Sequence, residues 1–289
     1  MIYSATHITR HLYQSPVSQS LNELCLTPRS LTGQQVREVN ICIEPEPATW
    51  HRRKDYFGNE VIMVGIYEPH SRFVIEARSV VEVEAPAPGV VSSIPWEDAR
   101  DLIASQPDDE SLAAIEFVFD SPFVAGGAEL AEFALPTFTP RRPLAEALNE
   151  LSHRIYGEFK YKPNSTSIKM PLLEVLRNRQ GVCQDFAHVM IGALRSLRLA
   201  ARYTSGYLRS SPGSKGAEAS HAWVSAFVPG SGWLSFDPTN DVVPSDRHLT
   251  LAWGRDYGDV TPVKGVAVGG GTHSVEVEVT VQPVGTNPH

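Results

Sequence analysis

One stretch decides how the rest of this sequence is interpreted: Gly181-Val182-Cys183-Gln184-Asp185-Phe186-Ala187-His188, continuing without a break to Leu197. Apolar residues recur at positions 187, 190, 191, 194 and 197, which is the spacing of one helix face. We expect the helix to begin near Gly181, so Cys183 falls in its first turn. Unpaired N–H groups and the positive end of the helix dipole favour a thiolate there. The alternative is a buried structural cysteine, because free cysteine is among the most buried residue types.

Two other polar residues of this helix have simpler interpretations. Asp185 is expected to cap the helix start, and at two positions from Cys183 it points about 200° away from the thiol. His188 is expected to be a packed or hydrogen-bonded histidine. It is a weaker alternative base, because it does not occupy the i+3 or i+4 position that would face Cys183.

Composition limits the class of protein. The 289 residues are enough for one large domain or two ordinary ones, and 42% apolar with 20% charged residues is typical of a soluble globular chain. A net charge of −8 argues against nucleic acid as the main partner. We find no signal-peptide pattern at the N-terminus and no run approaching the roughly 18 apolar residues of a membrane span, so no membrane association is expected.

The three cysteines, Cys25, Cys42 and Cys183, are too few and too scattered for a disulfide framework. The expected location is therefore the reducing cytoplasm, which would also keep a reactive thiol reduced. Cys42 falls within an alternating segment and is expected to be a core or sheet residue.

The chain divides by pattern into three regions. Residues 1–90 are rich in short alternating segments, at 36–43, 61–67 and 73–83, which predict a small β-sandwich or barrel. A break at Pro86–Gly89 leads into connecting helices and loops over 91–140, with a helix at 95–103. Residues 141–289 form the third region, with predicted helices at 143–156 and 171–179 and strands at 201–208 and 274–281.

A β-hairpin is predicted after the central helix. His221–Val228 alternates cleanly, a turn follows at 229–232, Trp233–Phe236 returns, and Pro238 ends the second strand. Opposite or diagonal residues of such a hairpin have Cβ atoms roughly 4.5 to 8 Å apart, so Asp237 can reach His221 if both lie on one face. The sequence leaves that register open.

Cys183, His221 and Asp237 are the residue types that thiol catalysis requires. A nucleophile needs a base within hydrogen-bond reach and a third group that orients the base. We therefore assign Cys183 as nucleophile, His221 as general base and acid, and Asp237 as the residue that holds the imidazole. The backbone N–H of Cys183 is the expected oxyanion donor, and weaker candidates for the oxyanion and substrate contacts are Tyr161, Gln184 and Trp223.

A metal site is the competing interpretation. Cys183, His188, His221 and Asp237 are all zinc-capable, but no pair has CxxC or HExxH spacing. We expect no metal and no cofactor.

At this point the sequence resembles a known family. The motifs are the Cys183 stretch quoted above, Ser220-His221-Ala222-Trp223-Val224, Gly232-Trp233-Leu234-Ser235-Phe236-Asp237-Pro238-Thr239-Asn240, Gly254–Val260 and, earlier, His7-Ile8-Thr9-Arg10, Pro28-Arg29 and Asp55-Tyr56-Phe57-Gly58-Asn59. They resemble the transglutaminase-like superfamily, in its bacterial form with a β-rich N-terminal region. The resemblance implies an α+β fold in which a papain-like core, with the Cys helix packed on an antiparallel sheet bearing His and Asp, follows an N-terminal β-sandwich-like domain.

The resemblance also implies a chemistry. Members of the family form a thioester that water or an amine resolves, so we expect a cysteine-dependent enzyme acting on a peptide or protein substrate. Hydrolysis is favoured over amine transfer, because nothing resembles the calcium sites or extra domains of animal cross-linking enzymes. A protein-glutamine transglutaminase, a non-catalytic peptide-binding module and a homo-oligomer remain open alternatives.

Overall fold

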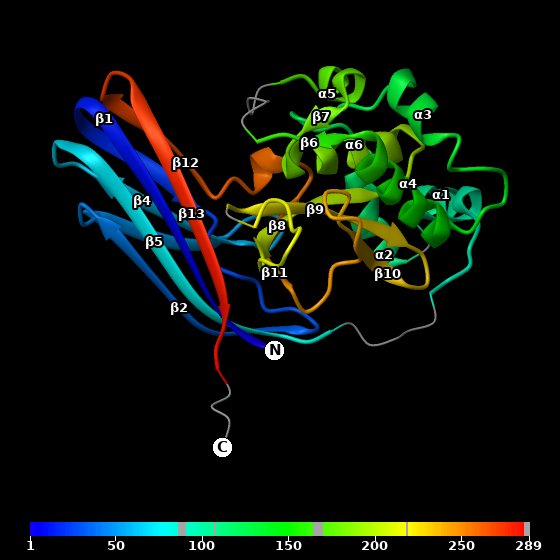
Figure 1. Cartoon of the computed structure of the whole chain (residues 1–289), viewed down its shortest axis with the longest axis horizontal. Helices are drawn as coiled ribbons and strands as arrows, with labels where there is room; N and C mark the ends of the chain where they lie inside the picture. Colours follow the sequence, from blue (N-terminus) through cyan, green and yellow to red (C-terminus); the bar gives the residue numbers. More distant parts are fainter. Residues whose placement is uncertain (86–90, 107, 164–169, 218, 286–289) are drawn as a thin grey trace.

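A long antiparallel sheet forms one side of the molecule and a helical module with its own sheet forms the other (Figure 1). The computed structural model describes residues 1–85, 91–106, 108–163, 170–217 and 219–285. The strands of the long sheet are β1 (Ile2–Leu24), β2 (Gln34–Glu44), β3 (Thr49–Lys54), β4 (Glu60–Ile66), β5 (His70–Val83), β12 (Val263–Gly269) and β13 (His273–Pro283). The predicted break at Pro86–Gly89 lies outside the described residues.

The long sheet is organised around β1. Strands β4 and β5 follow one another along one edge of β1, and β12 and β13 follow one another along its other edge. Ile62, Ile66, Phe73 and Ile75 of β4 and β5 share one small buried core. This curved half-barrel is the β-rich, sandwich-like region expected at the N-terminus, and the predicted α+β class is confirmed.

Strands from the end of the chain belong to this first sheet. The predicted strand at 274–281 exists as β13, but it and β12 pair with β1 rather than with the sheet of the core. Local alternation predicts that a strand forms, whereas its partner depends on contacts across more than 240 residues, as between Arg10 and Glu278, 268 positions apart. The division into 1–90, 91–140 and 141–289 stays a prediction.

The helical module surrounds a four-stranded sheet in the order β10-β9-β8-β11. Its helices are α1 (Trp96–Ser105), α2 (Asp109–Ile115), α3 (Ala128–Ala134), α4 (Leu144–Glu158), α5 (Leu172–Asn178) and α6 (Cys183–Ser196), with short 3₁₀ turns at Glu116–Val118 and Tyr257–Asp259. Its strands are β8 (Ala201–Leu208), β9 (His221–Val228), β10 (Gly232–Phe236) and β11 (His248–Gly254), and β6 (Lys160–Tyr161) pairs in parallel with β7 (Gln180–Gly181). Nowhere in the described ranges is a helix long and apolar enough to cross a membrane.

Helix α6 lies at the centre of this module (Figure 1). One side of it packs on β8 and β9, and other sides contact α3, α4 and α5. Almost every residue from Cys183 to Arg195 is therefore buried. The predicted central helix, the hairpin and the strand at 201–208 are confirmed within one or two residues at their ends.

Side-chain amides join the two parts of the molecule. Strand β11 is the edge of the four-stranded sheet, so its outer backbone groups need partners. The Gln34 amide donates to the carbonyl oxygen of Thr250 and accepts from its N–H, both at 2.8 Å. Asn59 does the same with Trp253, at 2.8 and 3.0 Å. These two amides take the place of a neighbouring strand and fix β11 against the N-terminal sheet.

Candidate active site

Cys183 is the first residue of α6, and its surroundings are set by a helix cap. The Asp185 carboxylate accepts a hydrogen bond from the backbone N–H of Val182 at 2.8 Å, so the predicted capping role is confirmed. Gly181 makes room for this cap, because a Cβ there would lie 2.5 Å from Asp185 Oδ2. Cys183 ends up only 8% exposed at the helix N-terminus.

The Cys183 thiol points toward the start of β9. Its Sγ lies 4.0 Å from the carbonyl oxygen of Ser220, the residue before His221. The Nδ1 atom of His221 is buried and has no hydrogen-bond partner in the described part of the chain. Cys183 is close enough to that ring to contribute to the pKa of His221.

The hairpin register places His221 and Asp237 on one face. Phe236 pairs with Val224, so Asp237 follows at the position opposite Trp223, two residues along β9 from His221. The sequence left open whether Asp237 and His221 lie on the same face of the hairpin, and in the structure they do. His221 Nε2 lies 2.8 Å from Asp237 Oδ2.

The Asp237 carboxylate is fully buried and receives five hydrogen bonds. Its Oδ2 atom accepts from Asn240 Nδ2 at 2.9 Å and from His248 Nε2 at 3.2 Å, in addition to His221. Its Oδ1 atom accepts from the backbone N–H groups of Thr239 and Asn240, at 2.9 and 3.2 Å. Burial alone would raise the pKa of this carboxyl, but the His221 charge and these donors hold it well below its usual range.

Asp237 in turn determines the charge of His221. Burial is the largest effect on the ring and lowers its pKa, but the adjacent Asp237 carboxylate and the Cys183 sulfur together raise the pKa to about 10. The upward direction follows from the direct bond between the ring and a buried anion. His221 is therefore an imidazolium at neutral pH.

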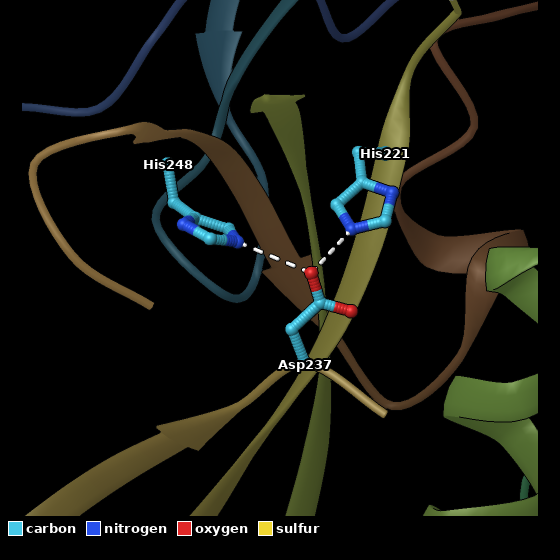
Figure 2. A group of neighbouring side chains, drawn as sticks. All are labelled: His221, Asp237 and His248. Atoms are coloured by element: carbon cyan, nitrogen blue, oxygen red, sulfur yellow. Dashed lines mark hydrogen bonds and ion pairs between the residues drawn. The ribbon is translucent and has the colours of Figure 1, made fainter. Parts of the chain in front are cut away.

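His248, which sequence reasoning missed, is the second imidazole on the same carboxylate. Figure 2 shows the His221 and His248 rings reaching one oxygen of Asp237 from opposite sides. His248 Nδ1 accepts from the backbone N–H of Ser245 at 3.4 Å, and burial lowers the pKa of the ring, so His248 is a neutral Nε2–H donor. Its strand pairs with β8 through a bulge, which no local pattern reveals. Asn240 lies in one of the sequence motifs, but the motif alone does not indicate its role.

Of the three weaker candidates for oxyanion and substrate contacts, Tyr161 and Gln184 lie near the Cys183 end of the site. Tyr161 pairs with Gly181 across β6 and β7, and its hydroxyl is 3.5 Å from the point where a Cβ on Gly216 would lie. The same point is 2.8 Å from His221 Nδ1, so Tyr161 faces the site. Gln184 is half-buried in the first turn of α6.

Trp223 has a packing role in the structure. It is buried against His248, with ring centroids 5.3 Å apart at 81°, and it covers Gly206, where a Cβ would lie 2.4 Å from the indole. His188 is also packed, as expected. It stacks on Phe123 and accepts from the N–H of Tyr257 at 3.2 Å, and burial lowers its pKa to about 4.

The His221, Asp237 and His248 side chains are of metal-ligating types and converge within 4.8 Å. Their N–O separations of 2.8 and 3.2 Å are hydrogen-bond lengths, and Asp237 Oδ2 already takes three donors. An ion would have to displace all of these hydrogen bonds. The geometry therefore favours a hydrogen-bonded array over a metal centre.

A cavity of about 840 Å³ lies behind this array, at the junction of the N-terminal sheet, α4 and the four-stranded sheet. Trp223 and His248 line it, together with Gln34, Asn149 and Phe236. Cys183, His221 and Asp237 are not among its lining residues, so the cavity borders the site at His248 and Trp223 and not at the thiol.

Comparison with known proteins identifies the family. Residues 3–82 match the bacterial transglutaminase-like N-terminal region, and residues 132–238 match the transglutaminase-like superfamily. An uncharacterized protein of Mycobacterium tuberculosis is 39% identical over 97% of this chain and 92% of its own length, and one of Mycobacterium leprae is 34% identical over 95% and 96%. The chain belongs to the transglutaminase-like superfamily, in its bacterial form with this N-terminal region.

One further sequence match and one solved structure have more informative descriptions. A protein-glutamine gamma-glutamyltransferase of Pseudomonas aeruginosa is 30% identical over 36% of this chain, but the match covers 16% of that protein. A crystal structure of a candidate cysteine protease from Cytophaga hutchinsonii superposes with a TM-score of 0.78 over 100% of this chain and 92% of its own, at 19% identity. At that identity the likeness shows a shared fold.

Proposed function

We propose that this protein is a cysteine-dependent acyl-transfer enzyme that acts on peptide or amide bonds through a thioester on Cys183, and that water resolves the thioester. One observation carries the proposal: His221 uses Nε2 for a buried carboxylate, which leaves Nδ1 unpartnered, among the described residues, beside a cysteine at a helix N-terminus. A nucleophile, a base and an orienting anion are thereby supplied in the order that thiol catalysis needs.

The proposed reaction begins from an ion pair. In the proposed mechanism, the His221 imidazolium faces Cys183, which reacts as the thiolate. The thiolate attacks the substrate carbonyl carbon, and the negative charge moves to the carbonyl oxygen. When the C–N bond breaks, the imidazolium donates its proton to the leaving amine and a thioester remains on Cys183.

The second half of the reaction uses His221 as a base. The neutral imidazole takes a proton from water as the water oxygen attacks the thioester, and collapse of that intermediate releases a carboxylic acid and restores the thiolate. Asp237 keeps the ring oriented through both halves. The backbone N–H of Cys183 and the Tyr161 hydroxyl are the proposed donors to the oxyanion.

The experiment is trapping of the acyl-enzyme. The full chain is incubated with a peptide library, quenched in acid and digested, and the Cys183 peptide is examined by mass spectrometry for an acyl adduct. The proposal predicts an adduct that Cys183→Ala abolishes and that His221→Gln strongly reduces. A library that leaves no adduct on Cys183, while every peptide stays intact, would contradict it.

A second arm separates hydrolysis from transfer. In ¹⁸O-labelled water, hydrolysis places one heavy oxygen in the released acid. With a primary amine such as a lysine peptide present, a transglutaminase instead forms a new amide, which is the activity named for the Pseudomonas relative. A non-catalytic peptide-binding module would retain peptide without either product.

A further inference from the structure

We propose that His248 is a positioning residue for the acyl-transfer site: it holds the Asp237 carboxylate in the orientation that His221 requires. The inference rests on the proposed function of Cys183 and His221. It adds a fourth member, contributed by β11, to Cys183 of α6 and the two residues of the hairpin.

His248 bonds the same carboxylate that orients His221. His248 and His221 share one oxygen of Asp237, at 3.2 and 2.8 Å, so rotation of the carboxylate that lengthens one contact disturbs the other. The second oxygen of Asp237 is tied to backbone N–H groups in its own turn. Asn240, in the turn after the hairpin, also donates to the shared oxygen, at 2.9 Å. His248 adds a donor from a different strand, β11, that limits rotation about the Asp237 side chain.

His248 is itself fixed in the donor form. The Ser245 backbone N–H at Nδ1 leaves the hydrogen on Nε2, and the edge of Trp223 packs against the ring at a centroid distance of 5.3 Å. Burial has the largest effect and lowers the pKa of the ring, Asp237 raises it, and the charges of His221 and Arg247 lower it further, so the net shift is downward and favours the neutral ring. A neutral donor can stabilise Asp237 without competing with the His221 imidazolium for its charge.

The strand that carries His248 is anchored independently. Gln34 holds both backbone groups of Thr250, two residues further along β11. The N-terminal sheet therefore helps to hold the strand that carries His248, in addition to its pairing with β8, which gives that sheet a part in the proposed chemistry.

The test is the pH dependence of Cys183 alkylation, because it reads the thiolate directly and needs no substrate. Full-length wild type, His248→Gln and His248→Leu are treated with iodoacetamide from about pH 5 to pH 10, and the modification of each cysteine is followed by mass spectrometry. Glutamine keeps an N–H donor near the position of Nε2, whereas leucine removes it. Thermal melts verify that each variant is folded.

We expect His248→Leu to move the rise in the Cys183 alkylation rate to higher pH by about one unit, which lowers the neutral rate about tenfold. His248→Gln should recover most of this loss. A folded leucine variant whose profile superposes on wild type overturns the inference. Equal loss in both variants also overturns it, because packing alone would then explain the effect.

His221→Gln separates this inference from the proposed function. If His221→Gln leaves the profile unchanged, the function itself is wrong; if it changes the profile and His248→Leu does not, only the role of His248 is wrong. Should the leucine variant fail to fold, His248→Ala with added imidazole replaces it, since His248 borders the cavity of about 840 Å³. Imidazole should accelerate alkylation in that variant and not in wild type, and a folded variant without rescue contradicts the proposal.

Discussion

At the scale of single residues, the site depends on which nitrogen of His221 remains free. Asp237 occupies Nε2, and Nδ1 has no hydrogen-bond partner among the described residues, so Nδ1 is the nitrogen that the proposed mechanism assigns to the thiol. Gly216 lies against this free nitrogen, because a Cβ there would be 2.8 Å from Nδ1. In the proposed mechanism, glycine at this position keeps open the space in which the thiol and the substrate would meet the ring.

Gly216→Ala tests this role of the glycine. Gly216 has a φ of +76°, and Gly213, in the same loop, has a φ of +85° and no described atom within 4 Å of the position that a Cβ would take. Alanine should cost each variant about 1 kcal/mol in the free energy of unfolding, because both backbones are left-handed. Only Gly216→Ala should slow Cys183 alkylation, by about tenfold or more, since it displaces the ring. Similar rates in Gly216→Ala and Gly213→Ala would show that the methyl does not disturb His221.

At the scale of secondary-structure elements, prediction from sequence succeeds where the signal is local. The helix after Gly181 and the hairpin from His221 follow from the spacing of apolar residues and from turn residues, and the structure has both. His248 could not be found in this way, because its place depends on the bulged pairing of β11 with β8. The pairing of β12 and β13 with β1 is non-local for the same reason.

The motifs Pro28-Arg29 and Asp55–Asn59 acquire a physical role at this scale. Arg29 stacks on Trp253 with its guanidinium carbon 3.6 Å from the ring centroid, and Asn59 bonds the backbone of the same tryptophan. These motifs join the N-terminal sheet to β11. They are recognised as family signatures in the sequence, whereas their contacts are visible only in the fold.

Gln34→Ala tests the junction between the sheet and β11. The variant loses both bonds to Thr250 and leaves two backbone groups of an edge strand without their partner, so the free energy of unfolding should fall by about 2 kcal/mol. Gln35→Ala, on the exposed side of the same strand, is the matched control and should change stability little. Urea denaturation measures both. Equal stability of the two variants would mean that the amide bonds contribute nothing net.

At the scale of the whole molecule, buried histidines couple stability to pH. Burial lowers the pKa of His7, in β1, and of His188, in α6, to about 4 in each case. Both rings ionise near 6.5 in the unfolded chain, which therefore binds more protons than the folded protein between these values. Their contribution to stability is complete above about pH 6.5 and is lost as pH falls toward 4.

We expect the free energy of unfolding to decrease over that range by up to about 3 kcal/mol for each histidine. His7→Phe should flatten the decrease, whereas His51→Phe should not, because His51 is exposed on β3. Urea titrations at about pH 4, 5 and 6.5 give the slopes. If the free energy of unfolding falls with pH as steeply in His7→Phe as in wild type, the His7 ring is not neutral in the folded protein.

The central claim is that Cys183 is an activated nucleophile, and competitive alkylation of the three cysteines tests it most directly. Cys42 is exposed, whereas Cys25 is buried and burial raises its pKa to about 12. With limiting iodoacetamide at neutral pH, we predict that Cys183 is modified first, although the residue is only 8% exposed. His221→Gln should remove that advantage. Modification of Cys42 before Cys183 in the folded wild-type protein would contradict the account.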